Sequence, residues 1–476
     1  MSLYSSIRMT SNTMRADQIA MQVIGQNIAN ANTPGYIREE TVLAPAPVQQ
    51  LGSLLLGLGV DVKAVIQKID TFLEERLRGS VSDRSSAEVK EETYGQLEGL
   101  VNELGDMDLS TDLNNFFSAI SEILNQPESV SVRNLAVLQG KTLATNITRL
   151  SNRVSEVRND LNDRVVDMAE RINKLTETIQ KLNIRIAETE GGDVSNSDAV
   201  GLRDQRLQAL EELAELIDIR VEEQESGGVT VYAGGDFLVY EGTRREVEVV
   251  YGTDRGLATA EIHLKETDSP LDISAGELAG LITSRDDILG GFLDQLDNFA
   301  GALIFEFNKV FSSGQGLNGF SELTSTYLVD ETDVPLDTAG LDFTPQNGSF
   351  DVILYNTRTG EAKTTTIKVD LNGINDDTTL EDLAAQLDAI DGLTASADAT
   401  GRITISADSI DQQFAFANDS SGVLAALGLN TFFTGSTARD IAVNTVVQED
   451  PSLFAASAGG IGVDTDIALE LADFLD

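Results

Sequence analysis

The feature that most constrains this chain is a long run of apolar residues spaced by alternating steps of three and four. Within residues 135–188 these residues share one side of a helix: Ile147, Leu150, Val154, Val157, Leu161, Val165, Met168, Ile172, Leu175, Ile179, Leu182 and Ile186. A doubled step of four at Leu161 is a stutter, which relaxes supercoiling locally. At about 1.5 Å per residue, roughly 50 helical residues span about 75 Å. We interpret this stripe as the intramolecular core of a helical rod.

A second, weaker seam lies in residues 1–31, which we also expect to be helical. Its apolar positions follow heptad spacing, with Thr10 and Asp17 as interruptions: Leu3, Ile7, Met14, Met21, Ile24 and Ile28. Such a helix is marginal alone, and Pro34-Gly35 ends it in a type II turn. No local core for it is evident. We therefore expect it to fold on assembly with neighbouring chains, the alternative being an ordinary intramolecular core.

The rest of the chain predicts further helices and two β-rich regions. Helices are expected over 66–124 with a break near 105–110, over 199–217, and over 277–311 after a capping box at Ser274–Glu277. Strands are expected over 219–265 and 320–455, the latter with paired strands at 350–355 and 363–369, a helix capped at Thr378–Glu381, a hairpin of 393–397 with 402–406, and a helical turn at 423–427. The fold class is α+β, elongated and multidomain, with a long antiparallel helical bundle or coiled-coil rod and β-rich outer domains.

This pattern divides the chain into five expected regions. They are an N-terminal helix (1–33), a linker with β segments (34–66), a helical rod domain (67–318) with a β insertion at about 219–265, an acidic β-rich outer domain (319–455) with a module at about 347–434, and a return toward the rod (456–476).

Charge and residue usage exclude several classes of function. Acidic residues outnumber basic ones by 78 to 33, a formal net charge of −45, whereas binding of nucleic acid or an anionic membrane needs a basic surface. The chain has no cysteine and one histidine, His263, so thiolate chemistry and two-histidine metal motifs are excluded. No apolar signal segment is visible, and the longest apolar run, 51–60, is shorter than the roughly 20 residues of a membrane span.

Several motifs resemble chemical sites, but each has a plainer interpretation. Gly314–Gly319 matches G-x-G-x-x-G, yet it follows a helix and not a strand, and Gly140-Lys141-Thr142 lies inside a helix. His263 lies in an alternating segment, where an exposed or edge histidine is the simpler interpretation. The acidic pairs Asp286-Asp287 and Asp376-Asp377 lack the spacing of a calcium loop. We therefore predict no catalytic, cofactor-binding or metal-binding residues.

The segment after the first helix carries a specific resemblance. The run from Asn27 to Tyr36 (NIANANTPGY) resembles the signature of bacterial flagellar rod, hook and hook-associated proteins, with these residues matching: Asn27, Asn30, Asn32, Thr33, Pro34, Gly35 and Tyr36. Leu202–Arg206 (LRDQR), the long helix 135–188 and Gly276–Gly280 (GELAG) resemble the hook-associated proteins of the hook–filament junction. Leu207 stands where that pattern often has Asp, and the usual second terminal helix is not seen before residue 476.

The resemblance implies a structural role without catalysis or cofactors. Family members leave the cell unfolded through the flagellar export apparatus, without a cleaved signal, and pair their terminal helices in the axial core. The implied partners are the hook protein, the next junction protein, further copies in a ring, and an export chaperone. The runner-up within the family is a hook or distal rod subunit, and another class is an acidic extracellular calcium-binding adhesin or enzyme.

Overall fold

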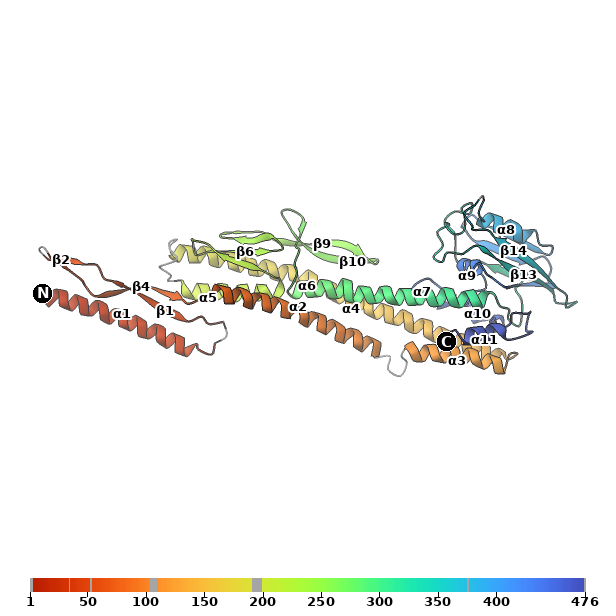
Figure 1. Ribbon diagram of the computed structural model, residues 1–476, viewed down its shortest axis with the longest axis horizontal. Helices are drawn as coiled ribbons and strands as arrows, with labels where there is room; N and C mark the ends of the chain where they lie inside the picture. Colours follow the sequence, from red (N-terminus) through yellow and green to blue (C-terminus); the bar gives the residue numbers. More distant parts are fainter. Residues whose placement is uncertain are drawn as a thin grey trace. The chain divides into compact units, whose positions relative to one another are not determined.

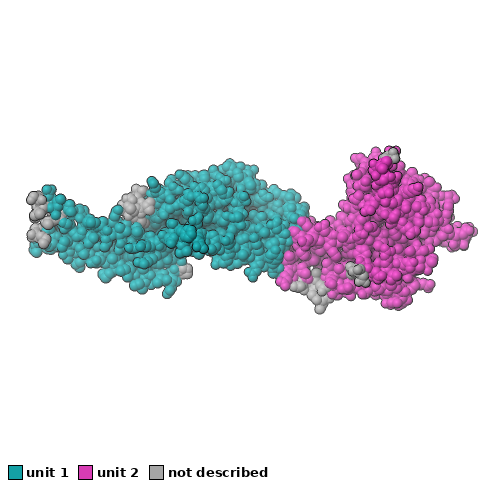
Figure 2. All heavy atoms as spheres, in the orientation of Figure 1, with its two compact units in different colours: residues 1–96, 157–290 teal, residues 97–156, 291–476 magenta. Residues whose placement is uncertain are grey.

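The computed structural model describes residues 3–33, 35–51, 54–102, 109–190, 199–374 and 376–474. These form two compact units, the first built from 1–96 and 157–290 and the second from 97–156 and 291–476, coloured teal and magenta in Figure 2. Both units combine helices with small antiparallel sheets, which confirms the α+β multidomain class.

The first unit begins with a helix packed on a β ribbon. Helix α1 (Leu3–Ala29) lies along the antiparallel pair β1 (Glu39–Pro45) and β4 (Val60–Gln67), as Figure 1 shows. A smaller pair, β2 (Gln49–Leu51) and β3 (Leu54–Leu56), joins them. Ala16 and Val23 are the two residues of α1 that are buried. The expectation that α1 lacks a local core is therefore wrong, because its small residues allow the ribbon to approach closely.

Long helices form the centre of the first unit. They are α2 (Thr71–Asn102) up to residue 96, α4 (Val130–Glu190) from residue 157, and α5 (Val200–Leu216), with the short α6 (Glu277–Thr283) packed on α5; the remaining parts of α2 and α4 belong to the second unit. The helix expected at 135–188 is confirmed in α4. Ten of its twelve seam residues are buried, the exceptions being the half-buried Val157 and Leu175. The seam is therefore an intramolecular core, as the spacing predicted.

Two sheets of the first unit are linked to α4 by polar side chains. One sheet has the order β5 (Arg220–Glu223), β6 (Val229–Ala233), β7 (Asp236–Tyr240) and β8 (Thr243–Arg244); the other has β11 (Ser269–Pro270), β10 (Leu257–Leu264) and β9 (Val247–Asp254). The buried Arg158 guanidinium pairs with Asp254 and donates from Nε to the Arg285 carbonyl at 3.0 Å. Asn173 makes two hydrogen bonds with the backbone of Val247, at 2.7 and 3.0 Å. The β region expected at 219–265 is confirmed.

The helix begins at Glu277 as expected, but the expected capping box of Ser274 with Glu277 is wrong. Gly276 is its N-cap with φ 91°, and no side chain caps it. The Ser274 hydroxyl instead donates to the Asp218 carboxylate at 2.8 Å. A Cβ on Gly276 would lie 2.6 Å from the Leu216 carbonyl oxygen, so close approach and positive φ both favour glycine there. A π-helical turn (Ser284–Leu289) then separates α6 from α7 (Gly290–Ser312).

The second unit contains a phenylalanine core between helices and loops. Helix α3 (Leu109–Asn125) packs on α11 (Asp466–Ala472). Rings from α3, α7 and the later loops are fully or almost fully buried: Phe116, Phe117, Phe307, Phe311, Phe432, Phe433 and Phe454. The Phe116 and Phe307 ring centroids are 5.3 Å apart, within the range of favourable aromatic contact.

The acidic region of the second unit forms a separate hydrophobic core. Its strands are β12 (Glu322–Thr324), β13 (Gly348–Asn356), β14 (Ala362–Val369), β15 (Leu393–Ala397), β16 (Ile403–Ala407) and β17 (Gln412–Ala417), in two sheets ordered β14-β13-β17 and β12-β16-β15. Helices α8 (Leu380–Asp388) and α9 (Val423–Leu427) also contribute to this core. The chain then continues through β18 (Phe433–Thr434), β19 (Ala442–Val443), α10 (Thr445–Glu449) and the 3-10 turn Pro451–Leu453. The paired strands β13 and β14, the hairpin of β15 with β16, and helix α9 were predicted. The cap of α8 is one residue later than expected, at Thr379, which forms a capping box with Asp382.

Candidate functional site

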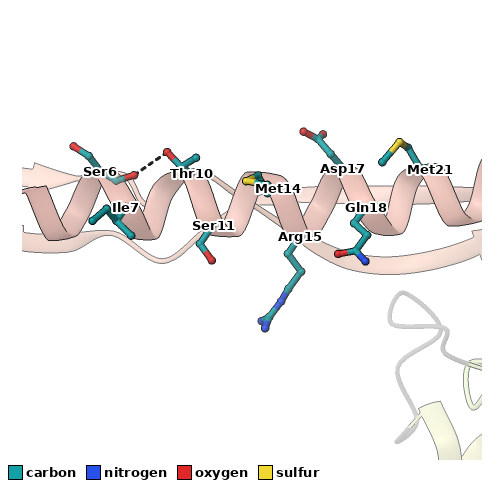
Figure 3. A pocket seen from close by; sticks show the side chains of 9 residues that line it. All are labelled: Ser6, Ile7, Thr10, Ser11, Met14, Arg15, Asp17, Gln18 and Met21. Carbon is teal, nitrogen blue, oxygen red and sulfur yellow. Dashed lines mark hydrogen bonds between the residues drawn. The ribbon is translucent and has the colours of Figure 1, made fainter.

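The apolar stripe of α1 faces away from the β ribbon. All six of its predicted positions are exposed, between 56% and 80%: Leu3, Ile7, Met14, Met21, Ile24 and Ile28. We call these six residues the α1 seam. Single exposed apolar residues are ordinary, but a stripe along one whole helix is typical of a surface that another helix covers. Figure 3 shows Ile7, Met14 and Met21 projecting from the helix.

Two polar residues, Thr10 and Asp17, interrupt the α1 seam, but they leave its six apolar side chains exposed. Thr10 donates its hydroxyl to the Ser6 carbonyl of the preceding turn at 3.0 Å, so it needs no partner from another chain. Asp17 lies between Met14 and Met21 in sequence and lines the same shallow hollow with them (Figure 3). The seam therefore offers apolar contacts with one carboxylate among them.

The opposite side of α1 is held to the ribbon by hydrogen bonds as well as by packing. The Asn12 side chain donates to the Leu58 carbonyl at 3.1 Å. Gly59, with φ 88°, lies so close that an added Cβ would be 3.0 Å from the Met9 carbonyl oxygen. The ribbon thus fixes which side of α1 remains free.

The signature residues that follow α1 form a hydrogen-bonded corner. Asn27 donates to the Glu39 carbonyl and accepts from the Glu39 N–H, both at 2.9 Å, and its oxygen also accepts from the Tyr36 hydroxyl at 3.0 Å. The Tyr36 N–H donates to the Thr33 carbonyl at 3.2 Å, and Gly35 has φ 74°. The signature therefore sets the angle between α1 and β1.

The other signature residues have smaller roles. The Thr33 hydroxyl donates to the Asn30 side-chain oxygen at 3.3 Å, and the Asn30 side chain donates to the Gln26 carbonyl at 3.1 Å. Asn32 is exposed. Pro34 lies outside the described residues, and so does the type II turn expected there.

Two carboxyl groups meet where this corner reaches α5. Gln67 of β4 donates its side-chain amide to Asp204 of α5. Burial raises the pKa of Asp204, and burial together with the Asp204 charge raises the pKa of Glu39. The environment therefore disfavours the charged form of both groups.

The two arginines of the LRDQR motif, Arg203 and Arg206, are buried in the first unit, whereas Gln205 is exposed. The Arg203 guanidinium pairs with both Glu190 carboxylate oxygens at 2.8 Å, and Arg206 donates to the Asn183 side-chain oxygen at 3.0 Å and the Gly227 carbonyl at 2.7 Å. These two arginines tie α5 to the end of α4 and to the β5–β6 turn. Sequence reasoning found the motif by resemblance but gave these side chains no role.

The motifs set aside as chemical sites have structural roles. Gly314–Gly319 is a loop after α7, where a Cβ on Gly316 would lie 2.4 Å from the Ser452 carbonyl oxygen. Lys141 lies within α4, as predicted. Asp286 pairs with Arg285 at 2.7 Å and with Arg158 at 3.3 Å, and Asp377 accepts from the Gly373 N–H at 3.1 Å.

The interpretation of His263 as an exposed or edge histidine is wrong. It lies on the central strand β10, and its side chain is 13% exposed because β11 folds back over it. Its Nδ1 is 3.0 Å from an Asp268 carboxylate oxygen and its Nε2 is 3.4 Å from Glu261. Burial alone lowers its pKa, but these hydrogen bonds outweigh burial and raise it.

The described residues contain neither a cluster of metal-binding side chains nor a membrane-spanning helix. Within the described ranges, no three or more His, Asp or Glu side chains are grouped so that they could hold a metal ion. Among the helices in that part of the chain, none is both long and apolar enough to cross a membrane.

Comparison with known proteins gives matches to flagellar axial families. The model of the flagellar hook-associated protein FlgK helical domain matches residues 94–323, and the model of the flagella basal body rod protein matches residues 7–36, which contain most of α1 and the signature. A solved structure, the flagellar hook junction protein FlgK from Burkholderia pseudomallei, has a TM-score of 0.49 and 17% identity, covering 80% of this chain and 66% of that one.

Four curated relatives share the name flagellar hook-associated protein 1. Flagellar hook-associated protein 1 of Bacillus subtilis is 27% identical over 213 residues, which are 43% of this chain and 41% of that protein. The Salmonella typhimurium protein of that name is 25% identical over 309 residues, 63% of this chain and 54% of that protein. The chain thus spans about half the length of the relatives it matches. The helical-domain match, the rod-type match at the N-terminus and these relatives agree, and over these regions the chain is similar to flagellar hook-associated protein 1.

Proposed function

We propose that this chain is a structural adaptor of the bacterial flagellum that joins the hook to the filament and catalyses no reaction. It assembles through its terminal helices, with α1 in the axial core. Its partners are the hook protein, the next junction protein and further copies of itself in a ring. It leaves the cell without a cleaved signal and resides at the hook–filament junction.

The observation that carries this proposal is the exposure of the α1 seam. Full burial of a large aliphatic side chain is worth roughly 1.5–3 kcal/mol, and α1 holds six such side chains that the ribbon leaves uncovered. A helix from the same or a neighbouring protein would bury them. The match of the rod-protein model to residues 7–36 supports an axial role for this helix.

The proposed domains follow from this role. Residues 1–33 would be the axial-core helix and 34–66 its linker. Residues 67–318 would form the helical rod domain with the β insertion at about 219–265, 319–455 the acidic outer domain with the module at about 347–434, and 456–476 the return toward the rod. An outer position suits the acidic region, because its 27 acidic and 5 basic residues in 320–476 favour contact with water.

The test is incorporation at the hook tip in cells. Met21 and Ile24 are both replaced by Asp in the full-length gene, which places two charges in the α1 seam. The matched control replaces Gln22 and Gln26, exposed residues of α1 outside the seam, by Asp. We expect the seam variant to abolish filaments and the control to retain them. Normal filaments with the seam variant would contradict the proposal.

A further inference from the structure

The first unit contains a pocket of about 340 Å³ that the axial role does not use. The start of α2, the middle of α5 and strands β5 and β6 line it. Its size is within the usual range for ligand sites. Arginine side chains from two helices converge on it: Arg78, Arg203 and Arg206.

Arg78 has unused hydrogen-bonding capacity inside this pocket. The residue is 7% exposed, and its Nε has no hydrogen-bond partner in the described part of the chain. The nearest carboxylate oxygen of its ion-pair partner, Glu74 Oε2, is 3.9 Å from Nη1, too far for a hydrogen bond, and that oxygen is itself buried without a partner among the described residues. A buried guanidinium with open donors is costly unless another group satisfies it.

The second cation, Arg206, is also incompletely compensated. Its hydrogen bonds go to neutral oxygens of Asn183 and Gly227, and the Glu223 carboxylate is 3.9 Å away. Burial, with the neighbouring Arg203 charge, lowers the pKa of Arg206 to about 10, and burial lowers the pKa of Arg78. Both groups would therefore gain from a further anion.

The remaining walls define the shape of that anion. Ile69, Leu207 and Val221 make one side apolar, and Phe72, 66% exposed, lies at the rim. Glu74 and Glu75 also line the pocket, and their charge disfavours a multiply charged ion such as phosphate. A single carboxylate on an apolar stem matches both features, since a planar carboxylate accepts two bonds from a guanidinium.

We infer that this pocket binds an aspartate or glutamate side chain of a second copy of this chain. Three arginines and three glutamates line the pocket, so the choice rests on Arg78, whose buried Nε has no acceptor among the described residues. The chain's excess of 45 acidic over basic residues supplies the carboxylates that a second copy would offer. The inference rests on the proposed function for the presence of a second copy. Its chemistry does not depend on that function, because it can be tested on the isolated chain.

The first arm of the experiment tests the chemistry with sodium hexanoate, a carboxylate on an apolar stem. Binding to the 476-residue chain is followed by saturation-transfer NMR, with hexanol as the probe that lacks the charge. Arg78→Gln removes the open guanidinium, and Arg84→Gln, at an exposed position of the same helix outside the pocket lining, is the matched control. We expect saturable hexanoate binding that weakens about tenfold in Arg78→Gln and is unchanged in Arg84→Gln. Absence of saturable binding, or equal weakening in both variants, would overturn the site.

The second arm tests the partner. The chain has no cysteine, so Phe72→Cys carries a single photo-crosslinker at the rim. Isotopically labelled and unlabelled copies are mixed, irradiated and analysed by mass spectrometry. We expect mixed-isotope crosslinks to acidic segments, reduced about tenfold by Arg78→Gln and by excess hexanoate. Crosslinks confined to one copy would refute the second copy as occupant. Such a result would leave the proposed axial role untouched, because that role is tested separately by hook-tip incorporation in cells.

Discussion

The α1 seam and the seam of α4 each contain a methionine, so the same substitution, methionine to alanine, can be compared at an exposed and a buried position. Met21 on the α1 seam is 67% exposed, whereas Met168 on the α4 seam is 1% exposed, and both residues belong to the first unit. Replacing a buried methionine by alanine costs about 2–5 kcal/mol through lost burial and the cavity left behind. Met21 keeps only a third of its side chain out of water, so its truncation should cost under about 1 kcal/mol.

The assay is thermal and urea unfolding of the isolated 476-residue chain, followed by circular dichroism. For a domain of 150–250 residues, 1 kcal/mol corresponds to about 2–4 °C in Tm. We therefore expect Met168→Ala to lower Tm by at least about 4 °C, and Met21→Ala by less than about 4 °C. An equal loss in the two variants would refute the reasoning, because the α1 seam would then be an intramolecular core.

Further expected outcomes concern proteolysis, pH and calcium. Limited proteolysis of the isolated chain should cut within residues 1–33 before it cuts α4, since α1 has one covered side and α4 is packed along its seam; the opposite order of fragments would contradict this. Because Glu39 and Asp204 have raised pKa values in the folded chain, the folded state binds more protons, and the free energy of unfolding should fall as pH rises from their ordinary values through the raised ones. Asp204→Asn should flatten that dependence while still accepting the Gln67 bond, and an unchanged pH profile would count against the assignment. Isothermal calorimetry should detect no stoichiometric calcium binding; a defined tight site would favour the calcium-binding adhesin.

The spacing of apolar residues predicted the long helix α4, because the side chains that become buried fall on one side of an α-helix. The α4 seam repeats over eleven steps, so a single interruption at Leu161 does not obscure it. The strands β13 and β14 and the hairpin of β15 with β16 were also visible, because alternation and the Asp398–Gly401 turn coincide.

Other features depend on contacts between segments far apart in the chain. Gly276 replaces the expected cap because Leu216 and Ile217 lie against it, and no local pattern reports that approach. The ribbon that covers Ala16 and Val23 comes from residues 39–67, so the alanine and valine of α1 could not be identified as its docking face. The pocket at Arg78 combines α2 and α5, and its lining residues Arg78 and Arg203 are 125 positions apart in the sequence.

The central claim is that the α1 seam is exposed in the free chain and buried in the flagellum. Because the chain lacks cysteine, Met21→Cys in the full-length protein provides a single reactive thiol on the seam. Its rate of maleimide labelling is measured on free protein and on isolated hook–filament particles, with Ile410→Cys, at a position 99% exposed, as the labelling control. We expect the thiol at position 21 to react in the free protein and to be protected in the particles, while the control reacts in both. Equal reactivity of the thiol at position 21 in free protein and particles would contradict the account.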